Sequence, residues 1–166
     1  MKRRQAIGIL GLVTAAKAAS TRDRFVGVWK LLTVERKTKS GDITYPFGQQ
    51  PLGRITYDKK GRMSAQVIRK GRRSASLTAS QNSLDSIRTA TADDLRDMVT
   101  GFACYFGTYD VDEGAQMVIH HVEGAFLPTW IGTDLKRNYQ FAGNRLTLSV
   151  ASANAVTSLV WERESD

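Results

Sequence analysis

The chain has 166 residues, of which 42% are hydrophobic and 24% are charged, and its formal net charge is +8. This length and balance are typical of one soluble globular domain with a single sizeable core, and we expect no second domain. The only cysteine, Cys104, excludes a disulfide framework. We expect it to pack as a small buried residue.

The first 18 residues differ in character from the rest. Three basic residues open the chain, an apolar run follows from Ala6 to Ala16, and small residues lead up to Ala18. This layout predicts an export signal cleaved after Ala18, with residues 19–166 as the mature domain, and the arginine pair resembles a twin-arginine signal. The apolar run of about 11 residues is shorter than the roughly 20 needed to cross a bilayer. We therefore expect a periplasmic or secreted protein without stable membrane insertion.

Loss of this leader would remove four positive charges and leave a net charge of about +4 on the mature chain. The remaining basic excess gathers in "RKGRR", the segment from Arg69 to Arg73. It contains no interleaved aromatic residues, and the chain carries no nucleic-acid fold signature. We interpret the segment as a solvated loop and expect no nucleic-acid partner; the alternative is an interaction patch for an anionic partner.

Short apolar, β-branched segments alternate with glycine-containing turns from Phe25 onward. Eight strands are predicted: "FVGVWKLLTVERK", "GRITYD", "RMSAQVIRK", "ACYFGTYDV", "AQMVIHHVEG", "TDLKRNYQFAG", "NRLTLSVA" and "VTSLVWERE". Short connections favour antiparallel neighbours, and closing the sheet removes its two exposed edges. The sequence therefore predicts a mainly β protein: an eight-stranded antiparallel up-and-down barrel, wide enough for packed side chains or one small ligand.

One segment, residues 69–102, interrupts the strands. Its first half is rich in serine and arginine and is typical of a loop. Its second half begins at a good N-cap, Thr91, and predicts one inserted helix from Ala92 to Phe102. One face of this helix is apolar: Leu95, Met98, Val99 and Phe102. The helix would either plug one mouth of the barrel as a lid or pack against its outside.

The two ends of the domain carry a pattern that resembles the lipocalin and calycin barrels. Gly27 and Trp29 form a G-x-W near its start, and Arg163 follows a tryptophan near its end. Further blocks, "PFGQQPLGRITYDKKGRMSAQV", "CYFGTYDVDEG" and "MVIHHVEGAFLPTWIGTDLKRNYQFAGNRLTL", are similar to the bacterial and fungal lipocalin-like domain family over residues 25–163. The resemblance implies a lipocalin-like barrel with a central cavity and a guanidinium lying across the Trp29 indole. It implies little about chemistry, because fold alone does not set function.

The two histidines of the chain, His120 and His121, are adjacent. Successive side chains of a strand point to opposite faces, so the pair cannot bind one ion together. There is no third histidine to complete a site, and we expect neither a metal nor a cofactor. His120 shares its face with Val118 and Val122, whereas Glu123 shares the face of His121. We predict that His120 points inward and His121 lies in the wall or at the surface.

Arg137 lies on an otherwise apolar face of its predicted strand, which we take to be the inner face. The residues that alternate with it are Leu135, Tyr139 and Phe141. A buried guanidinium needs a counter-charge, because an isolated buried charge is heavily penalised. That charge could come from the protein, through Glu35 or Glu123, or from a carboxylate, phenolate or enolate of a ligand.

Aromatic residues on the neighbouring segments could complete a pocket. Tyr105 and Tyr109 share one face, and Gly107 between them leaves room for a ligand or a bulky neighbour. Trp130, just after Pro128, is expected at the barrel rim. The predicted ligand-binding set is Tyr105, Tyr109, His120, Trp130 and Arg137.

These residues together predict an apolar cavity with a few convergent polar groups, which is typical of a small-molecule site. We expect the protein to bind a small hydrophobic or amphipathic molecule. The alternative is an isomerase or cyclase in which His120 is the general base and Arg137 or a tyrosine stabilises an enolate. No nucleophile elbow, phosphate-binding loop or dinucleotide fingerprint supports a hydrolase, kinase or dehydrogenase.

Overall fold

The computed structural model describes residues 20–72, 87, 88 and 90–165. The predicted export signal lies outside these residues. So do Arg73 and most of the serine-rich segment that follows it.

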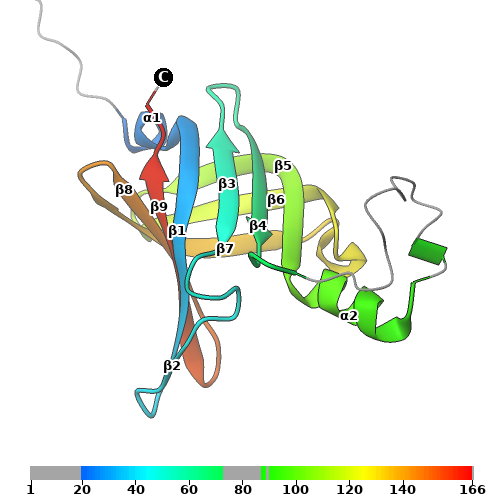
Figure 1. Ribbon diagram of the computed structural model, residues 1–166. Coiled ribbons are helices and arrows are strands. Elements are labelled where there is room, and N and C mark those ends of the chain that lie inside the picture. The colour runs from blue at the N-terminus through cyan, green and yellow to red at the C-terminus, as the bar shows by residue number, and fades with distance from the viewer. Residues whose placement is uncertain (1–19, 73–86, 89, 166) are drawn as a thin grey trace, which may run out of the picture.

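Strands make up most of the described chain (Figure 1). In order, the elements are α1 (Thr21–Phe25), β1 (Gly27–Thr38), β2 (Ile43–Thr44), β3 (Leu52–Tyr57), β4 (Arg62–Ile68), α2 (Ala92–Thr100), β5 (Phe102–Asp112), β6 (Met117–Ala125), the 3-10 helix η2 (Pro128–Trp130), β7 (Asp134–Ala142), β8 (Arg145–Ala151) and β9 (Ala155–Arg163).

The strands form one sheet that closes on itself. Strand β1 pairs with β3, each strand from β3 to β8 pairs with the next one along the chain, and β9 returns to pair with β1. All of these pairings are antiparallel, and β2 is only a two-residue addition to β1. The predicted eight-stranded antiparallel up-and-down barrel is therefore confirmed for the part of the chain that the structure describes. Closure leaves no long edge strand among the described strands to recruit a foreign chain.

Helix α1 closes one end of the barrel (Figure 1). Its last residue, Phe25, is fully buried, and its ring meets Tyr57, Tyr139 and Phe141 edge to face, with centroids 5.2, 5.1 and 4.9 Å away. Edge-to-face contacts add to the free energy gained by burying each ring. This aromatic plug seals the α1 end of the barrel.

The pair suggested by the resemblance lies directly beside the plug. The Arg163 guanidinium lies 4.1 Å from the centroid of the Trp29 ring and donates hydrogen bonds to the carbonyl oxygens of Val26, at 2.6 Å, and Arg24. The Trp29 indole donates to the Phe25 carbonyl at 2.8 Å. The first and last strands thus fix the position of α1 through directed bonds. Gly27 has a φ of +134°, which favours glycine, and a Cβ there would meet the guanidinium at 2.5 Å.

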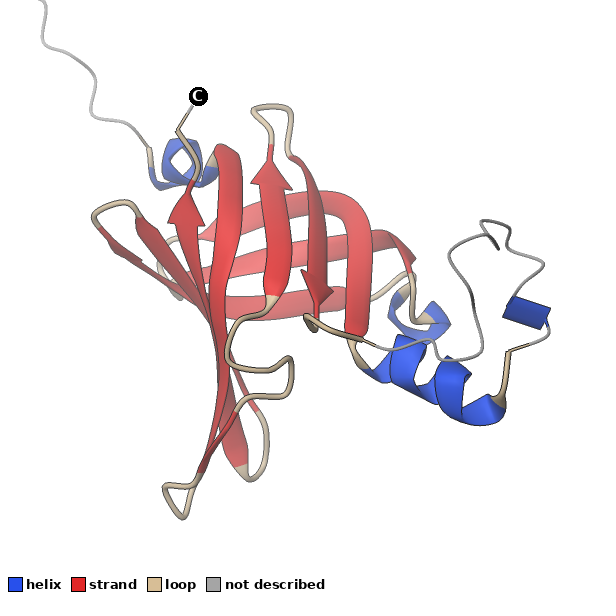
Figure 2. Cartoon of the chain, in the orientation of Figure 1, coloured by secondary structure: helices blue, strands red, loops and turns tan. Residues whose placement is uncertain are grey.

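Helix α2 is shorter than predicted and lies outside the barrel (Figure 2). It ends at Thr100, because Gly101 caps it, and Phe102 begins β5 instead. No residue of α2 lines the internal cavity, and Val99 on its apolar stripe is 44% exposed. The outside position, and not a plug in the mouth, is therefore observed. No helix among the described residues is long and apolar enough to span a membrane.

The described arginines of the basic segment pack against this helix. Arg69 pairs with the Asp97 carboxylate, and Arg72 donates to the Met98 carbonyl at 2.7 Å. The Arg72 guanidinium also lies 5.2 Å from the centroid of the Phe102 ring. These contacts stabilise α2 against the start of β5 and leave less of the basic segment available to a partner.

Candidate functional site

A buried polar cluster lies inside the barrel around His120. This side chain has no solvent exposure, as the strand alternation predicted. Its Nε2 lies 2.8 Å from the Tyr57 hydroxyl, and its Nδ1 lies 2.9 Å from the Tyr105 hydroxyl. Strands β3, β5 and β6 each contribute one member. Buried polar groups are costly unless they are hydrogen-bonded, so the three side chains satisfy one another.

The cluster is electrically neutral near neutral pH. Burial, with a contribution from the nearby Arg137 charge and from His121, lowers the pKa of His120 to about 3. Burial raises the pKa of Tyr105 to about 12, and it raises the pKa of Tyr57 well above its ordinary value. A neutral imidazole has one N–H and one acceptor nitrogen, so one tyrosine donates to His120 and the other accepts from it.

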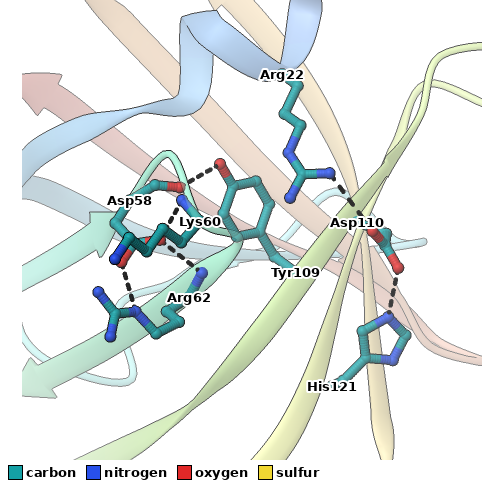
Figure 3. A network of polar contacts seen from close by, with 7 residues as sticks. All are labelled: Arg22, Asp58, Lys60, Arg62, Tyr109, Asp110 and His121. Atoms are coloured by element: carbon teal, nitrogen blue, oxygen red, sulfur yellow. Dashed lines mark hydrogen bonds and ion pairs between the residues drawn. The ribbon is translucent and has the colours of Figure 1, made fainter.

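His121 points to the opposite face of β6, as predicted. Its side chain is 37% exposed and lies between two carboxylates, with Nδ1 2.6 Å from Asp134 and Nε2 3.2 Å from Asp110. Figure 3 shows the contact between His121 and Asp110, and the ion pair between Asp110 and Arg22 of α1. In this ion pair the Arg22 guanidinium nitrogen and the Asp110 carboxylate oxygen are 3.8 Å apart. The hydrogen bond that the His121 Nδ1–H donates to the Asp134 carboxylate is the main cause of a raised pKa for His121. The adjacent histidines therefore have opposite electrostatic surroundings.

An apolar cavity of about 220 Å³ occupies the interior of the barrel beside this cluster. Three of the predicted site residues, Tyr105, Trp130 and Arg137, line it. The remaining lining residues come from the surrounding strands and the segment before β3: Val34, Phe47, Ile55, Ala65, Val67, Ala103, Leu148, Val150, Thr157, Leu159 and Trp161. A larger hollow of about 540 Å³ over β7 and β8 is lined mainly by polar side chains and Arg24, outside the buried cluster.

Two polar groups of the cavity wall lack the partners expected of them. Arg137 donates one hydrogen bond, to the Lys136 carbonyl at 2.9 Å, but no carboxylate among the described residues lies within 4.0 Å of it. Of the two alternatives for its counter-charge, the protein carboxylate, Glu35 or Glu123, is therefore not observed within the described chain. The buried indole nitrogen of Trp161 also has no hydrogen-bond partner among the described residues. Buried polar atoms of this kind call for an explanation.

The family of the chain is shown by its sequence. A model of the lipocalin-like domain matches residues 26–164. The chain belongs to the lipocalin-like domain family. No curated protein matches it. The matched region spans the whole barrel, from β1 to the end of β9, and includes every residue of the cavity wall described above.

The lipocalin-like barrel places two predicted site residues away from the cavity. Tyr109 shares the inner face with Tyr105, but it lies in the aromatic plug at the α1 end, where its hydroxyl donates to the Asp58 carbonyl at 3.1 Å (Figure 3). His120 lies behind Tyr105 and is not part of the cavity surface. The space at Gly107 is also not open to a ligand. A Cβ there would meet the His121 carbonyl oxygen at 1.9 Å, where a β-bulge brings β6 against β5.

Sequence reasoning missed two residues of the lipocalin-like site. Tyr57 is the second partner of His120, although it lies 63 residues away in the chain. Trp161 is the tryptophan that precedes Arg163 in the pattern at the end of the domain, and its indole also lies against the cavity. The alternation in "GRITYD", which puts Ile55 and Tyr57 on one face, was the available signal for the first. Within the described residues, no three His, Cys, Asp or Glu side chains are grouped as metal ligands would be.

Proposed function

We propose that this lipocalin-like protein binds a small hydrophobic or amphipathic molecule inside its barrel. The observation that carries the proposal is the internal cavity, whose wall is apolar apart from Tyr105, Thr157, Arg137 and the two indoles. An apolar hollow with a few polar groups is typical of small-molecule sites. Its volume of about 220 Å³ lies below the roughly 300–1,000 Å³ of drug-sized sites, which favours a small ligand.

Ligand entry is proposed at the end of the barrel opposite α1. The aromatic plug around Phe25 blocks the α1 end, where this residue is fully buried. At the other end β1 and β9 extend beyond the neighbouring strands (Figure 1), and the cavity residue Val150 is 36% exposed. A molecule can therefore reach the cavity without displacing the plug.

A binding titration with a neutral probe, 1-octanol, tests this proposal. Trp130 and Trp161 both line the cavity, so occupancy should change the tryptophan fluorescence of the protein. Ala103→Phe puts a ring into the cavity, whereas Ala142→Phe adds the same ring at an exposed position of β7. We expect Ala103→Phe to weaken octanol binding by at least about tenfold and Ala142→Phe to leave it within about threefold of the wild type.

Two results would contradict the proposal. One is the absence of any octanol binding to the wild type. The other is an Ala103→Phe protein that is folded by circular dichroism and still binds octanol as the wild type does.

The enzyme alternative, with His120 as general base, has weaker physical support. A base needs to reach the proton it removes, directly or through one water. Both ring nitrogens of His120 are engaged by tyrosines, the side chain does not line the cavity, and a pKa of about 3 makes it a poor base. We therefore favour binding without turnover.

We further propose that residues 1–18 direct export, so that the protein acts in the periplasm or outside the cell. The basic start, the apolar run and the small residues up to Ala18 support this proposal. Mass spectrometry of the protein from its own host should find an N-terminus at Ala19. An intact Met1 on the accumulated protein would contradict it.

A further inference from the structure

Arg137 projects into the barrel from the middle of β7. The strand alternates strictly, and its half-buried residues are the inner-facing ones: Leu135, Arg137, Tyr139 and Phe141. Arg137 lies on the cavity surface together with Leu148 and Trp161. The guanidinium is thus part of a wall that is otherwise almost entirely apolar.

The charge of Arg137 is not compensated by the groups around it. Its hydrogen bond goes to a neutral carbonyl, that of Lys136, and no described carboxylate lies within 4.0 Å. Its positive potential reaches Tyr57 and Tyr105, where it opposes part of the rise in pKa that burial causes, and His120, where it adds to the fall in pKa that burial causes. All three side chains are nevertheless neutral near pH 7. A half-buried guanidinium in such surroundings is costly in free energy unless an anion joins it.

We infer that the ligand is an organic anion, and that Arg137 binds its charged head while the apolar wall holds its body. This inference rests on the proposed binding function and adds the chemical class of the ligand. A carboxylate is the simplest such head, because its two oxygens match the fork of N–H donors on a guanidinium. A small cavity with a single guanidinium fits one acidic group on a short apolar chain or a single ring system.

Other donors of the site favour the same class of ligand. An anion offers only acceptors, and it would receive hydrogen bonds from the Tyr105 hydroxyl. One arrangement of the cluster leaves this hydroxyl free to donate. In it, the Tyr57 hydroxyl donates to Nε2 of His120, and the Nδ1–H of His120 donates to the Tyr105 oxygen. In this arrangement His120 is a positioning residue: both of its ring nitrogens and the Tyr57 hydrogen are satisfied, and only the Tyr105 hydrogen is left to donate elsewhere. The cluster then directs a hydrogen toward the cavity.

Isothermal titration calorimetry with three probes of equal chain length tests the inference: octanoate, 1-octanol and octylammonium at neutral pH. We expect the wild type to bind octanoate at least about tenfold more tightly than octanol, and octylammonium most weakly, because a charged hydrogen bond is worth about 1.5–3 kcal/mol. In Arg137→Met, octanoate affinity should fall by about 10- to 100-fold, whereas octanol affinity should stay within about threefold of the wild-type value.

Lys136→Met is the matched control, because it removes the same charge from the next residue, which is exposed on the outer face of β7. It should change octanoate affinity by less than about threefold. Arg137→Lys, which keeps the charge but loses the fork, should fall between the wild type and Arg137→Met.

Two results would overturn the inference while leaving the binding function intact. They are equal affinities of the wild type for octanoate and octanol, and an Arg137→Met protein that keeps the preference for octanoate. The comparison of octanoate with octanol on the wild type still tests whether the site prefers an anion, even if Arg137→Met does not fold. Failure of all three probes to bind would contradict the proposed function itself.

Discussion

Replacement of His120 by leucine tests the buried cluster, and His121→Leu is its natural control. Both substitutions remove an imidazole from the same strand, one from the interior and one from the outer face. His120→Leu keeps a bulky side chain in place but leaves the Tyr57 and Tyr105 hydroxyls without their partner.

The expected cost follows from these two hydroxyls. A buried polar group that loses its partner costs about 1–3 kcal/mol, so two of them predict a loss of about 2–6 kcal/mol in the free energy of unfolding. Urea denaturation followed by circular dichroism at neutral pH measures this loss. His121→Leu breaks only exposed ion pairs, which are worth about 0–1 kcal/mol.

The pH dependence gives a second and sharper readout of His120. Its pKa is about 3 in the folded protein and roughly 6.5 in the unfolded chain. Below pH 6.5 the unfolded chain binds the additional proton, so the contribution of the neutral imidazole is lost as the pH falls toward 3. The slope is about 1.4 kcal/mol per pH unit. The stability difference between the wild type and His120→Leu should therefore shrink between pH 7 and pH 4.

Two results would refute this reasoning. The first is a His120→Leu protein within about 1 kcal/mol of the wild type at neutral pH, which would mean that the hydroxyls find other partners or water. The second is a stability difference that stays constant with pH, which would mean that His120 is protonated equally in the folded and unfolded states.

Three other predictions concern the outer histidine and the closed end of the barrel. Because His121 has a raised pKa, its stabilising contribution, up to about 1 kcal/mol, should be complete below pH 6.5 and lost as the pH rises through the folded-state pKa, which is the opposite sign to His120. Urea titrations at pH 6 and pH 9 measure the stability difference between the wild type and His121→Leu. The same difference at both pH values would exclude this contribution. Phe25→Ala should lower the free energy of unfolding by about 3–5 kcal/mol, whereas Phe106→Ala should lower it by less than about 1 kcal/mol, because Phe106 is 56% exposed. Similar urea midpoints for the two variants would show that the plug is not packed as described. Arg163→Met should lower the free energy of unfolding by about 2–3 kcal/mol, because it removes hydrogen bonds and the stacking of the guanidinium on Trp29. Arg145→Met, at an exposed position, should leave the stability nearly unchanged. Equal thermal midpoints for the two variants would contradict this.

Strand periodicity explains what could be predicted from the sequence. Adjacent side chains of a strand must face opposite ways, so the separation of His120 from His121 and the inward position of Arg137 follow from local geometry alone. The number of strands and their closure follow from the short turns and the need to remove edges.

Contacts across the barrel could not be predicted in this way. The pairing of Tyr57 with His120 depends on the register of strands that are not neighbours. Tyr109 shares the face of Tyr105, but the level at which each side chain meets the plug or the cavity depends on the tilt of the whole sheet. Whether Arg137 finds a carboxylate is likewise a property of the closed barrel, in which Glu123 faces outward.

Intermolecular nuclear Overhauser effects between bound octanoate and the protein test the central claim, ligand binding inside the barrel, most directly. We predict contacts from the octanoate chain to the cavity residues Leu148 and Trp161. Contacts only to the outer residues Phe106 and Phe126, whose rings are exposed, would place the ligand on the surface and contradict the claim.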